Sequence, residues 1–138
     1  MPHFVVDKLV EALSSQMKPL KEAVILILGV AYKKDVEDCR ESPSLAIWES
    51  LKKKGAMVFY HDPFISQLPH LHEHTSLSHE KSVALESEML AMVDVVLILT
   101  DHSCIDYSKV AEHARLIVDT RNACKNVDPK YRDKIIKA

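Results

Sequence analysis

Unbroken runs of Val, Ile and Leu are the feature that most constrains how this chain can fold. The runs in "VILIL" at 24–28 and "DVVLILTDH" at 94–102 are apolar at successive positions, so their side chains are buried on both faces of a strand. "AMVFYHDP" at 56–63 and "RLIVDTRN" at 115–122 are interpreted as two further strands. Because segments of helical character separate them, the sequence predicts an α/β fold. We expect a doubly wound, mainly parallel, Rossmann-like sheet with helices on both faces.

The segments between these strands carry helix and loop signals. Ser42 and Pro43 suit the N-cap and first turn of a helix that runs to Lys54, with Gly55 in the C-cap region. Further expected elements are a loop over 65–81, a short edge strand "SVAL" at 82–85, helices over 86–92 and 107–114, and a last helix in the lysine-rich tail after 128.

The amino terminus is predicted to form an amphipathic helix that no strand precedes. Its apolar stripe consists of Val6, Leu9, Val10, Leu13 and Met17, and Pro19 ends it. The residues alone leave two arrangements open. Such a helix either packs on another domain or subunit, or folds back on this same sheet.

Composition excludes several classes of protein. The chain has 138 residues, 47% of them hydrophobic, which fits one domain with a real core. Its net charge of -2 disfavours a nucleic-acid partner. It has neither a membrane-spanning apolar run nor signal-peptide features, and its three cysteines form no C-x-x-C pair. We therefore expect a cytoplasmic protein with free thiols and no membrane partner.

Polar residues follow the strands at the ends where doubly wound sheets bind ligands. They occur in "GVAYKKD", "TDH" and "DTRN", so Lys33 and Arg121 are expected to converge on one edge of the sheet. A lysine and an arginine suit a phosphate, a carboxylate or sugar hydroxyls. The alternative is that both are solvated charges paired with Asp35, Glu37 or Asp119.

The loop after the first strand lacks the glycines of a phosphate-binding loop. Gly29 stands alone and the chain contains no G-x-G-x-x-G, so an autonomous dinucleotide site has no support. Cys39 in the same loop has no neighbouring base or resolving cysteine in the sequence. We interpret it as an ordinary buried or half-buried thiol and assign no catalytic residue.

Four histidines and the tryptophan invite functional interpretations. His70, His72 and His74 alternate in "PHLHEH" and would face one way on an extended segment, as metal ligands can. A solvated loop is favoured because no cysteine or carboxylate completes a tetrahedral set, so no metal is assigned. His102 is either a substrate contact or, as we favour, a strand-end histidine held by a local hydrogen bond. Trp48 is expected to pack in the core.

Several long stretches resemble one known family. "GVAYKKDVEDCRESPSLAIWESLKKKGAMVFYHDP", "VDVVLILTDHSCIDY" and "LIVDTRNA" are similar to the carboxy-terminal, UDP-binding domain of the UDP-glucose/GDP-mannose dehydrogenase family. The resemblance covers nearly the whole chain in the right order. It implies that residues 1–20 are the end of the central-domain helix and its connection, and that 21–138 form the carboxy-terminal UDP-sugar-binding domain.

The resemblance implies an enzymatic setting that extends beyond this chain. Such enzymes oxidise the C6 alcohol of a nucleotide sugar to the carboxylate in two NAD-dependent steps, through a covalent intermediate on a cysteine. An amino-terminal Rossmann domain supplies most of the NAD site, and the central region supplies the cysteine. The chain by itself would lack both and be inactive. Its implied partners are a UDP-sugar and the missing amino-terminal and central domains, in a homo-oligomer built through the central helices.

Carried over by motif, Tyr32 and Lys33 would contact the substrate, Arg121 would bind its sugar or phosphate portion, and Arg40 would reach toward NAD. "LTDHSCIDY" and "VDTRNA" resemble the UDP-N-acetylhexosamine branch, such as the UDP-N-acetylglucosamine 6-dehydrogenases, more than the UDP-glucose branch. These enzymes supply uronic acids for surface polysaccharides. The alternatives are a UDP-glucose or GDP-mannose 6-dehydrogenase and a stand-alone nucleotide-binding regulatory module. A receiver domain is disfavoured, because "GVAYK" stands where it needs an acidic pair.

Overall fold

The sheet has five parallel strands in a doubly wound order. The computed structural model describes residues 2–40 and 42–138, without the side chains of residues 2 and 3. The strands are β1 (Val24–Leu28), β2 (Met57–His61), β3 (Val95–Ile98), β4 (Ile117–Asp119) and β5 (Ile135–Lys137). They lie in the order β2-β1-β3-β4-β5, and every pair is parallel. The order reverses between β1 and β3, which makes this the switch point where such sheets bind ligands.

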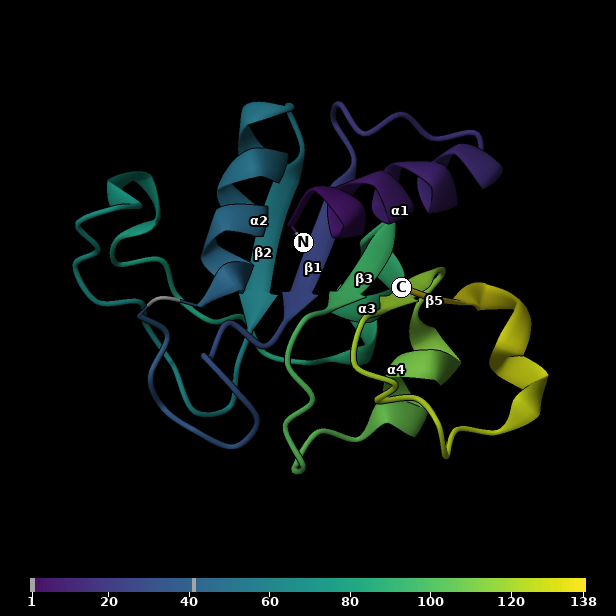
Figure 1. Ribbon diagram of the computed structural model, residues 1–138. Coiled ribbons are helices and arrows are strands. Elements are labelled where there is room, and N and C mark those ends of the chain that lie inside the picture. The colour runs from purple at the N-terminus through teal and green to yellow at the C-terminus, as the bar shows by residue number, and fades with distance from the viewer. Residues whose placement is uncertain (1, 41) are drawn as a thin grey trace.

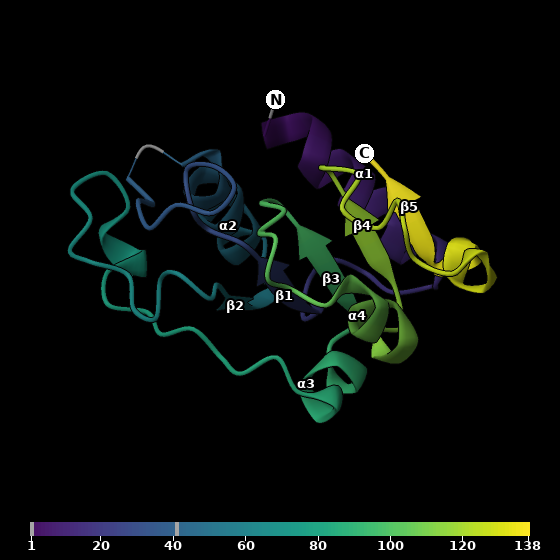
Figure 2. The same cartoon turned by 90° about the horizontal axis from the view of Figure 1, so that it is seen from below.

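Helices cover both faces of the sheet, as the sequence predicts. α1 (Pro2–Ser15) and α2 (Pro43–Lys53) lie on one face, and α3 (Ser87–Met92) and α4 (Tyr107–His113) lie on the other (Figures 1 and 2). Side chains of successive β1 residues point to opposite faces of the sheet. Ile25 and Ile27 join the core under α1 and α2, and Leu26 and Leu28 join the core under α3 and α4, which we call the α1–α2 core and the α3–α4 core. No helix in the described part of the chain is long and apolar enough to cross a membrane.

The amino-terminal helix folds back on this sheet. Leu9 and Leu13 of α1 are buried, and the helix contacts α2 and β4. Of the two arrangements that the sequence leaves open, the structure therefore shows the second. The packing also brings the start of α1 close to the end of the chain, because Val5 and Ala138 line one cleft.

Two of the predicted elements are wrong. Residues 82–85 do not form a strand: the Val83 N–H donates to the Tyr60 carbonyl at 2.8 Å, and the chain then leaves the edge of β2 for α3. The tail after 128 forms a 3-10 helix, η2 (Pro129–Lys134), followed by β5 instead of a last α-helix. Ile135 and Ile136 pair with β4 and contact opposite cores, which an α-helix would not allow.

The long segment between β2 and α3 is irregular, as predicted for 65–81, and it is packed. It contains one short 3-10 helix, η1 (Thr75–Leu77), and an isolated antiparallel bridge between Gln67 and Lys81. Its Ile65, Leu68, Leu71 and Leu77 are buried in the α1–α2 core. The segment therefore covers the side of α2 that faces away from α1 (Figure 1).

Candidate functional site

A cleft of about 380 Å³ opens at the switch point of the sheet. Its lining includes residues that follow β1, β3 and β4, namely Ala31, Tyr32, Leu99, Thr120 and Arg121, together with Phe4 of α1, Ser44 and Ile47 of α2, and Ala138. Most of the lining side chains are apolar, and the polar ones come from strand ends and from the start of α2. Both the position and the lining are typical of a small-molecule site in a doubly wound fold.

The structure brings two of the four predicted site residues together. Tyr32 and Arg121 line the same cleft, although they are 89 positions apart in the sequence. The Tyr32 side chain is half exposed, and the Arg121 Nε–H donates to the Leu99 carbonyl at 3.0 Å. This bond uses one of the five guanidinium N–H groups and orients the planar fork at the mouth of the cleft.

The other two predicted residues lie elsewhere. Lys33 is exposed and does not line the cleft. Lys33 and Arg121 therefore do not face each other across one cavity, although each follows a strand of the same sheet. The Arg40 guanidinium donates a hydrogen bond to the Asp38 carboxylate at 3.2 Å. Arg40 lines two other surface pockets, and Phe64 lines one of these as well. The substrate role of Lys33 and the NAD role of Arg40 stay predictions.

Two of the three carboxylates considered as partners for these cations, Asp35 and Asp119, are held by other groups. Asp35 accepts hydrogen bonds from the Ser103 backbone N–H at 2.8 Å and hydroxyl at 2.6 Å. The hydroxyl bond is the main reason that the pKa of Asp35 is lowered from its usual value. Asp119 accepts from the backbone N–H groups of Arg121, Ala123 and Cys124, which shapes the turn after β4. Both acids therefore organise loops.

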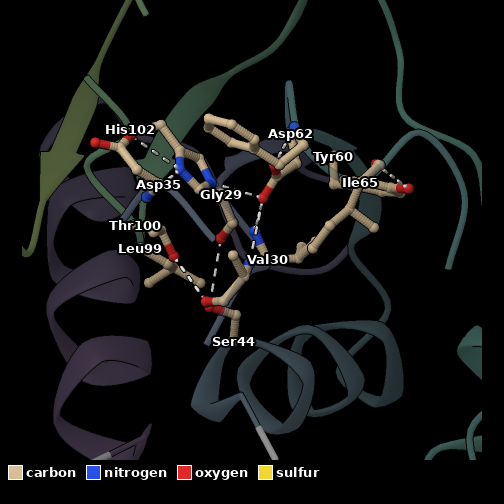
Figure 3. Close-up of polar contacts among 12 residues, drawn as sticks. Gly29, Val30, Asp35, Ser44, Tyr60, Asp62, Ile65, Leu99, Thr100 and His102 are labelled. Carbon is tan, nitrogen blue, oxygen red and sulfur yellow. Dashed lines mark hydrogen bonds and ion pairs between the residues drawn. The ribbon is translucent and has the colours of Figure 1, made fainter. Parts of the chain in front are cut away.

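The loop after β1 does not provide a cradle for a pyrophosphate. The Val30 and Ala31 N–H groups donate to Asp62 at 2.9 and 3.2 Å (Figure 3). The Gly29 N–H donates to the His61 carbonyl. Pro43 begins α2 without an N–H group of its own. Because a dinucleotide site uses such N–H groups, these residues do not fit an NAD site of their own.

A buried pair, Asp62 and His102, lies at the strand ends behind the loop that carries Tyr32. His102 is fully buried, and its Nε2 lies 2.9 Å from Asp62 Oδ2, while its Nδ1 accepts from the Asp35 N–H at 2.9 Å. His102 is hydrogen-bonded at the strand end, as the favoured interpretation expects, but its partners are distant in the sequence rather than local. Sequence reasoning missed Asp62, although an acid before Pro63 at the end of a strand was a usable signal. Its partner is 40 positions away, beyond the reach of local patterns.

The thiols and Trp48 occupy structural positions. Cys39 is buried as expected, and burial raises the pKa of its thiol. Cys124 is also buried, which raises the pKa of its thiol to about 12, whereas Cys104 is exposed. Trp48 is 2% exposed and packs against Tyr60 with ring centroids 5.3 Å apart, which confirms its predicted core role.

The histidine loop lies at the surface beside α2. His70 and His72 are exposed with ring centroids 5.1 Å apart, and His74 Nδ1 lies 3.3 Å from a Glu49 carboxylate oxygen. Across residues 2–40 and 42–138, no group of three or more His, Cys, Asp or Glu side chains is arranged to hold a metal ion.

Comparison with known proteins identifies the family. The model of the "UDP-glucose/GDP-mannose dehydrogenase family, UDP binding domain" matches residues 26–126. The chain belongs to this family. The match begins within β1 and ends after β4, so it includes the ends of β1, β3 and β4 at the cleft but not the end of β5. The resemblance that the sequence motifs indicate is confirmed.

Relatives of this UDP-binding domain are nucleotide-sugar dehydrogenases. The chain is 30% identical over 128 residues to a UDP-N-acetyl-D-mannosamine dehydrogenase of Salmonella typhi, covering 87% of this chain and 29% of that protein. It is 27% identical to an NDP-N-acetyl-D-galactosaminuronic acid dehydrogenase of Ralstonia nicotianae, covering 87% and 26%. The chain therefore spans less than a third of the length of these relatives.

Solved structures show the same fold. A UDP-D-ManNAc dehydrogenase from Pyrococcus horikoshii superimposes with a TM-score of 0.75 at 25% identity, over 99% of this chain and 30% of that one. A GDP-mannose dehydrogenase from Pseudomonas aeruginosa gives a TM-score of 0.57 at 18% identity, over 92% and 30%, which is a likeness of fold alone. The predicted fold class is confirmed.

Proposed function

We propose that the chain is the carboxy-terminal substrate-binding domain of an NAD-dependent nucleotide-sugar 6-dehydrogenase. The observation that carries the proposal is the meeting of Tyr32 and Arg121 in one switch-point cleft of a UDP-binding-domain family member. In this proposal the complete enzyme oxidises the C6 alcohol of a UDP-sugar to the uronate in the cytoplasm. Other domains supply the catalytic cysteine, most of the NAD site and the contacts of a homo-oligomer, while residues 1–20 end the central domain.

The residues have distinct roles in this proposal. Arg121, steadied by the Leu99 carbonyl, presents its remaining N–H groups to the diphosphate or the sugar. Tyr32 offers a half-exposed ring for stacking against the base or the sugar. Lys33 adds a compact positive charge from the exposed loop, outside the cleft itself. Arg40 reaches NAD that another domain holds.

The open cleft implies weak binding by the domain alone. Two or three charge-assisted contacts contribute about 1.5 to 3 kcal/mol each, against about 4 kcal/mol or more of lost translational and rotational freedom. The surplus predicts a Kd of UDP on the order of high micromolar to millimolar. A complete ligand site therefore needs surfaces from the rest of the enzyme.

The names of the relatives favour an N-acetylated sugar. UDP-N-acetyl-D-mannosamine dehydrogenases and an NDP-N-acetyl-D-galactosaminuronic acid dehydrogenase are among the proteins to which this chain is similar. We therefore propose a UDP-N-acetylhexosamine as substrate and a role in supplying uronic acids for polysaccharides. UDP-glucose and GDP-mannose are the alternatives, because structures with those specificities share the fold at TM-scores of 0.63 and 0.57.

An NMR titration of the ¹⁵N-labelled chain tests the proposal. UDP, UDP-N-acetylglucosamine, UDP-glucose, GDP-mannose and NAD are added separately, and amides at 30–42, 100–103 and 119–123 are followed. Weak, localised shifts with the UDP compounds are expected. Tight saturation would favour a self-sufficient regulatory module, and shifts elsewhere or with NAD alone would refute the assignment of the cleft.

A further inference from the structure

One oxygen atom of Asp62 joins three segments of the chain. Its Oδ2 accepts hydrogen bonds from the Val30 N–H at 2.9 Å, the Ala31 N–H at 3.2 Å and the His102 Nε2–H at 2.9 Å (Figure 3). Its other oxygen accepts from the Phe64 N–H at 2.8 Å. The carboxylate is thus fully engaged where β1, β2 and β3 end, at the start of the loop that carries Tyr32.

The His102 ring extends this connection to the far side of the same loop. Its Nδ1 lies 2.9 Å from the backbone nitrogen of Asp35, which donates the hydrogen bond. An accepting Nδ1 carries no proton, so the ring is the neutral tautomer with its proton on Nε2. The ring is fully buried, and Phe64 covers it at a centroid distance of 4.8 Å.

The backbone of Asp35 is left-handed where these bonds hold it. Its φ is +58°, a conformation that is uncommon outside glycine, although Asp adopts it more readily than most residues. Ser103, the neighbour of His102, adds two hydrogen bonds to the Asp35 carboxylate. The loop tip is therefore fastened to the segment after β3 through both its backbone and its side chain.

We propose that the Asp62–His102 pair positions Tyr32 and Lys33 for ligand binding. Both residues lie between Ala31 and Asp35, and each of these two anchors is bonded to one member of the pair. A loop with one loose end populates its binding conformation only part of the time, and the apparent affinity falls by that fraction. His102 and Asp62 are thus positioning residues that need not touch the ligand, an inference that rests on the proposed function.

The test compares two changes of His102 with a control histidine. His102→Leu removes the donor and the acceptor, whereas His102→Gln keeps one of each on a planar group. His61→Leu is the control, because His61 is a partly buried histidine that bonds the Val83 carbonyl at 2.7 Å and takes no part in the Asp62–His102 connection. Thermal stability, amide hydrogen exchange without ligand and the Kd of UDP by NMR are measured for each variant.

We expect His102→Leu to speed hydrogen exchange of the Asp35 amide. It should also weaken UDP binding by about tenfold, which is the loss expected if the loop adopts its binding conformation about a tenth of the time. His102→Gln should recover part of both losses. His61→Leu should lower thermal stability while leaving the Asp35 exchange rate and the Kd unchanged.

The outcomes separate this inference from the proposed function. Failure of the unchanged chain to bind any UDP compound would refute the proposed function, while exchange at Asp35 would still decide whether His102 anchors the loop. Binding by the unchanged chain, with the same Kd and Asp35 exchange in His102→Leu, would overturn the inference. If His102→Leu fails to fold, ¹⁵N shifts of the wild-type imidazole decide: an Nδ1-protonated ring would overturn it, and an Nε2–H ring with slow Asp35 exchange would support it.

Discussion

A methyl group on Gly29 would lie 2.7 Å from the carbonyl oxygen of Thr100 and closer still to its Cβ. Gly29 follows β1 and Thr100 follows β3, so this contact lies at the switch point. Gly29 also has a φ of +88°, which favours glycine. The lone glycine of this loop therefore permits two strand ends to approach each other, in a place where related folds use glycines to bind phosphate.

Replacement of Gly29 by alanine is expected to destabilise the protein by about 3 kcal/mol, because the new methyl group meets backbone that cannot yield easily. Gly55→Ala is the matched control. Gly55 has a φ of +93°, but its new methyl group would meet the flexible side chain of Lys21 at 3.1 Å. We expect that change to cost about 1 kcal/mol. Urea unfolding measures both, and equal losses would show that backbone strain alone explains the requirement for Gly29.

Arg121→Ala should weaken UDP binding by about tenfold or more, the effect of losing one charge-assisted contact. Arg121→Lys should not restore it, because lysine lacks the Nε–H that bonds the Leu99 carbonyl and the planar fork. NMR titration gives both Kd values. Unchanged affinity in Arg121→Ala would refute its place in the site.

Lys33→Ala tests whether a residue outside the cleft lining still contacts the ligand. We expect a loss of affinity of about tenfold if Lys33 supplies a charge to the phosphate or the sugar. Lys34→Ala is the control, because Lys34 is an exposed neighbour of the same charge with no assigned role. Equal affinities in the two variants would remove Lys33 from the site.

The three cysteines should differ in reactivity. Cys104 is exposed, whereas burial shields Cys39 and Cys124 and raises the pKa of both thiols. Because the thiolate is the reacting form, iodoacetamide at pH 8 should modify Cys104 in the native protein and the other two only after unfolding. Peptide mass mapping distinguishes them. Rapid native labelling of Cys39 would contradict its structural role and reopen a catalytic one.

Stability should fall as the solution becomes alkaline. Burial raises the pKa of the Cys124 thiol to about 12, whereas a thiol in an unfolded chain ionises near pH ~8.5. Between these values the folded state retains a proton that the unfolded state has lost. The stabilisation is thus complete below about pH 8.5 and is lost as the pH rises, with a slope that approaches ~1.4 kcal/mol per unit.

Urea unfolding at pH 7.5, 9 and 10 checks this slope. Cys124→Ala should flatten it, while Cys104→Ala, which alters an exposed thiol, should leave it unchanged. Burial also raises the pKa of Cys39, Tyr60 and Tyr107, so a shallower slope should remain in Cys124→Ala. A slope that is the same in all three proteins would contradict the assignment to Cys124.

Local patterns were sufficient for most of the fold. The apolar run that forms β1 and the Ser42–Pro43 start of α2 are visible in the sequence, and the Ser42 hydroxyl accepts the Ser44 N–H as an N-cap should. Strand β5 was missed because its two isoleucines stand alone in a lysine-rich tail, whereas the equally short β4 lies within the apolar run 116–118, and because β5 owes its form to pairing with β4. A segment this short has no clear period of its own.

The sequence by itself determined the two-faced strands, the helices between them, the absence of a glycine-rich loop and the family. Tertiary structure alone decided that α1 packs on this sheet, that Tyr32 rather than Lys33 shares a cleft with Arg121, and that Asp62 meets His102. The physical reason is distance along the chain. Periodicity and capping depend on neighbours a few positions apart, whereas these contacts join strand ends that become adjacent only when the parallel sheet is assembled.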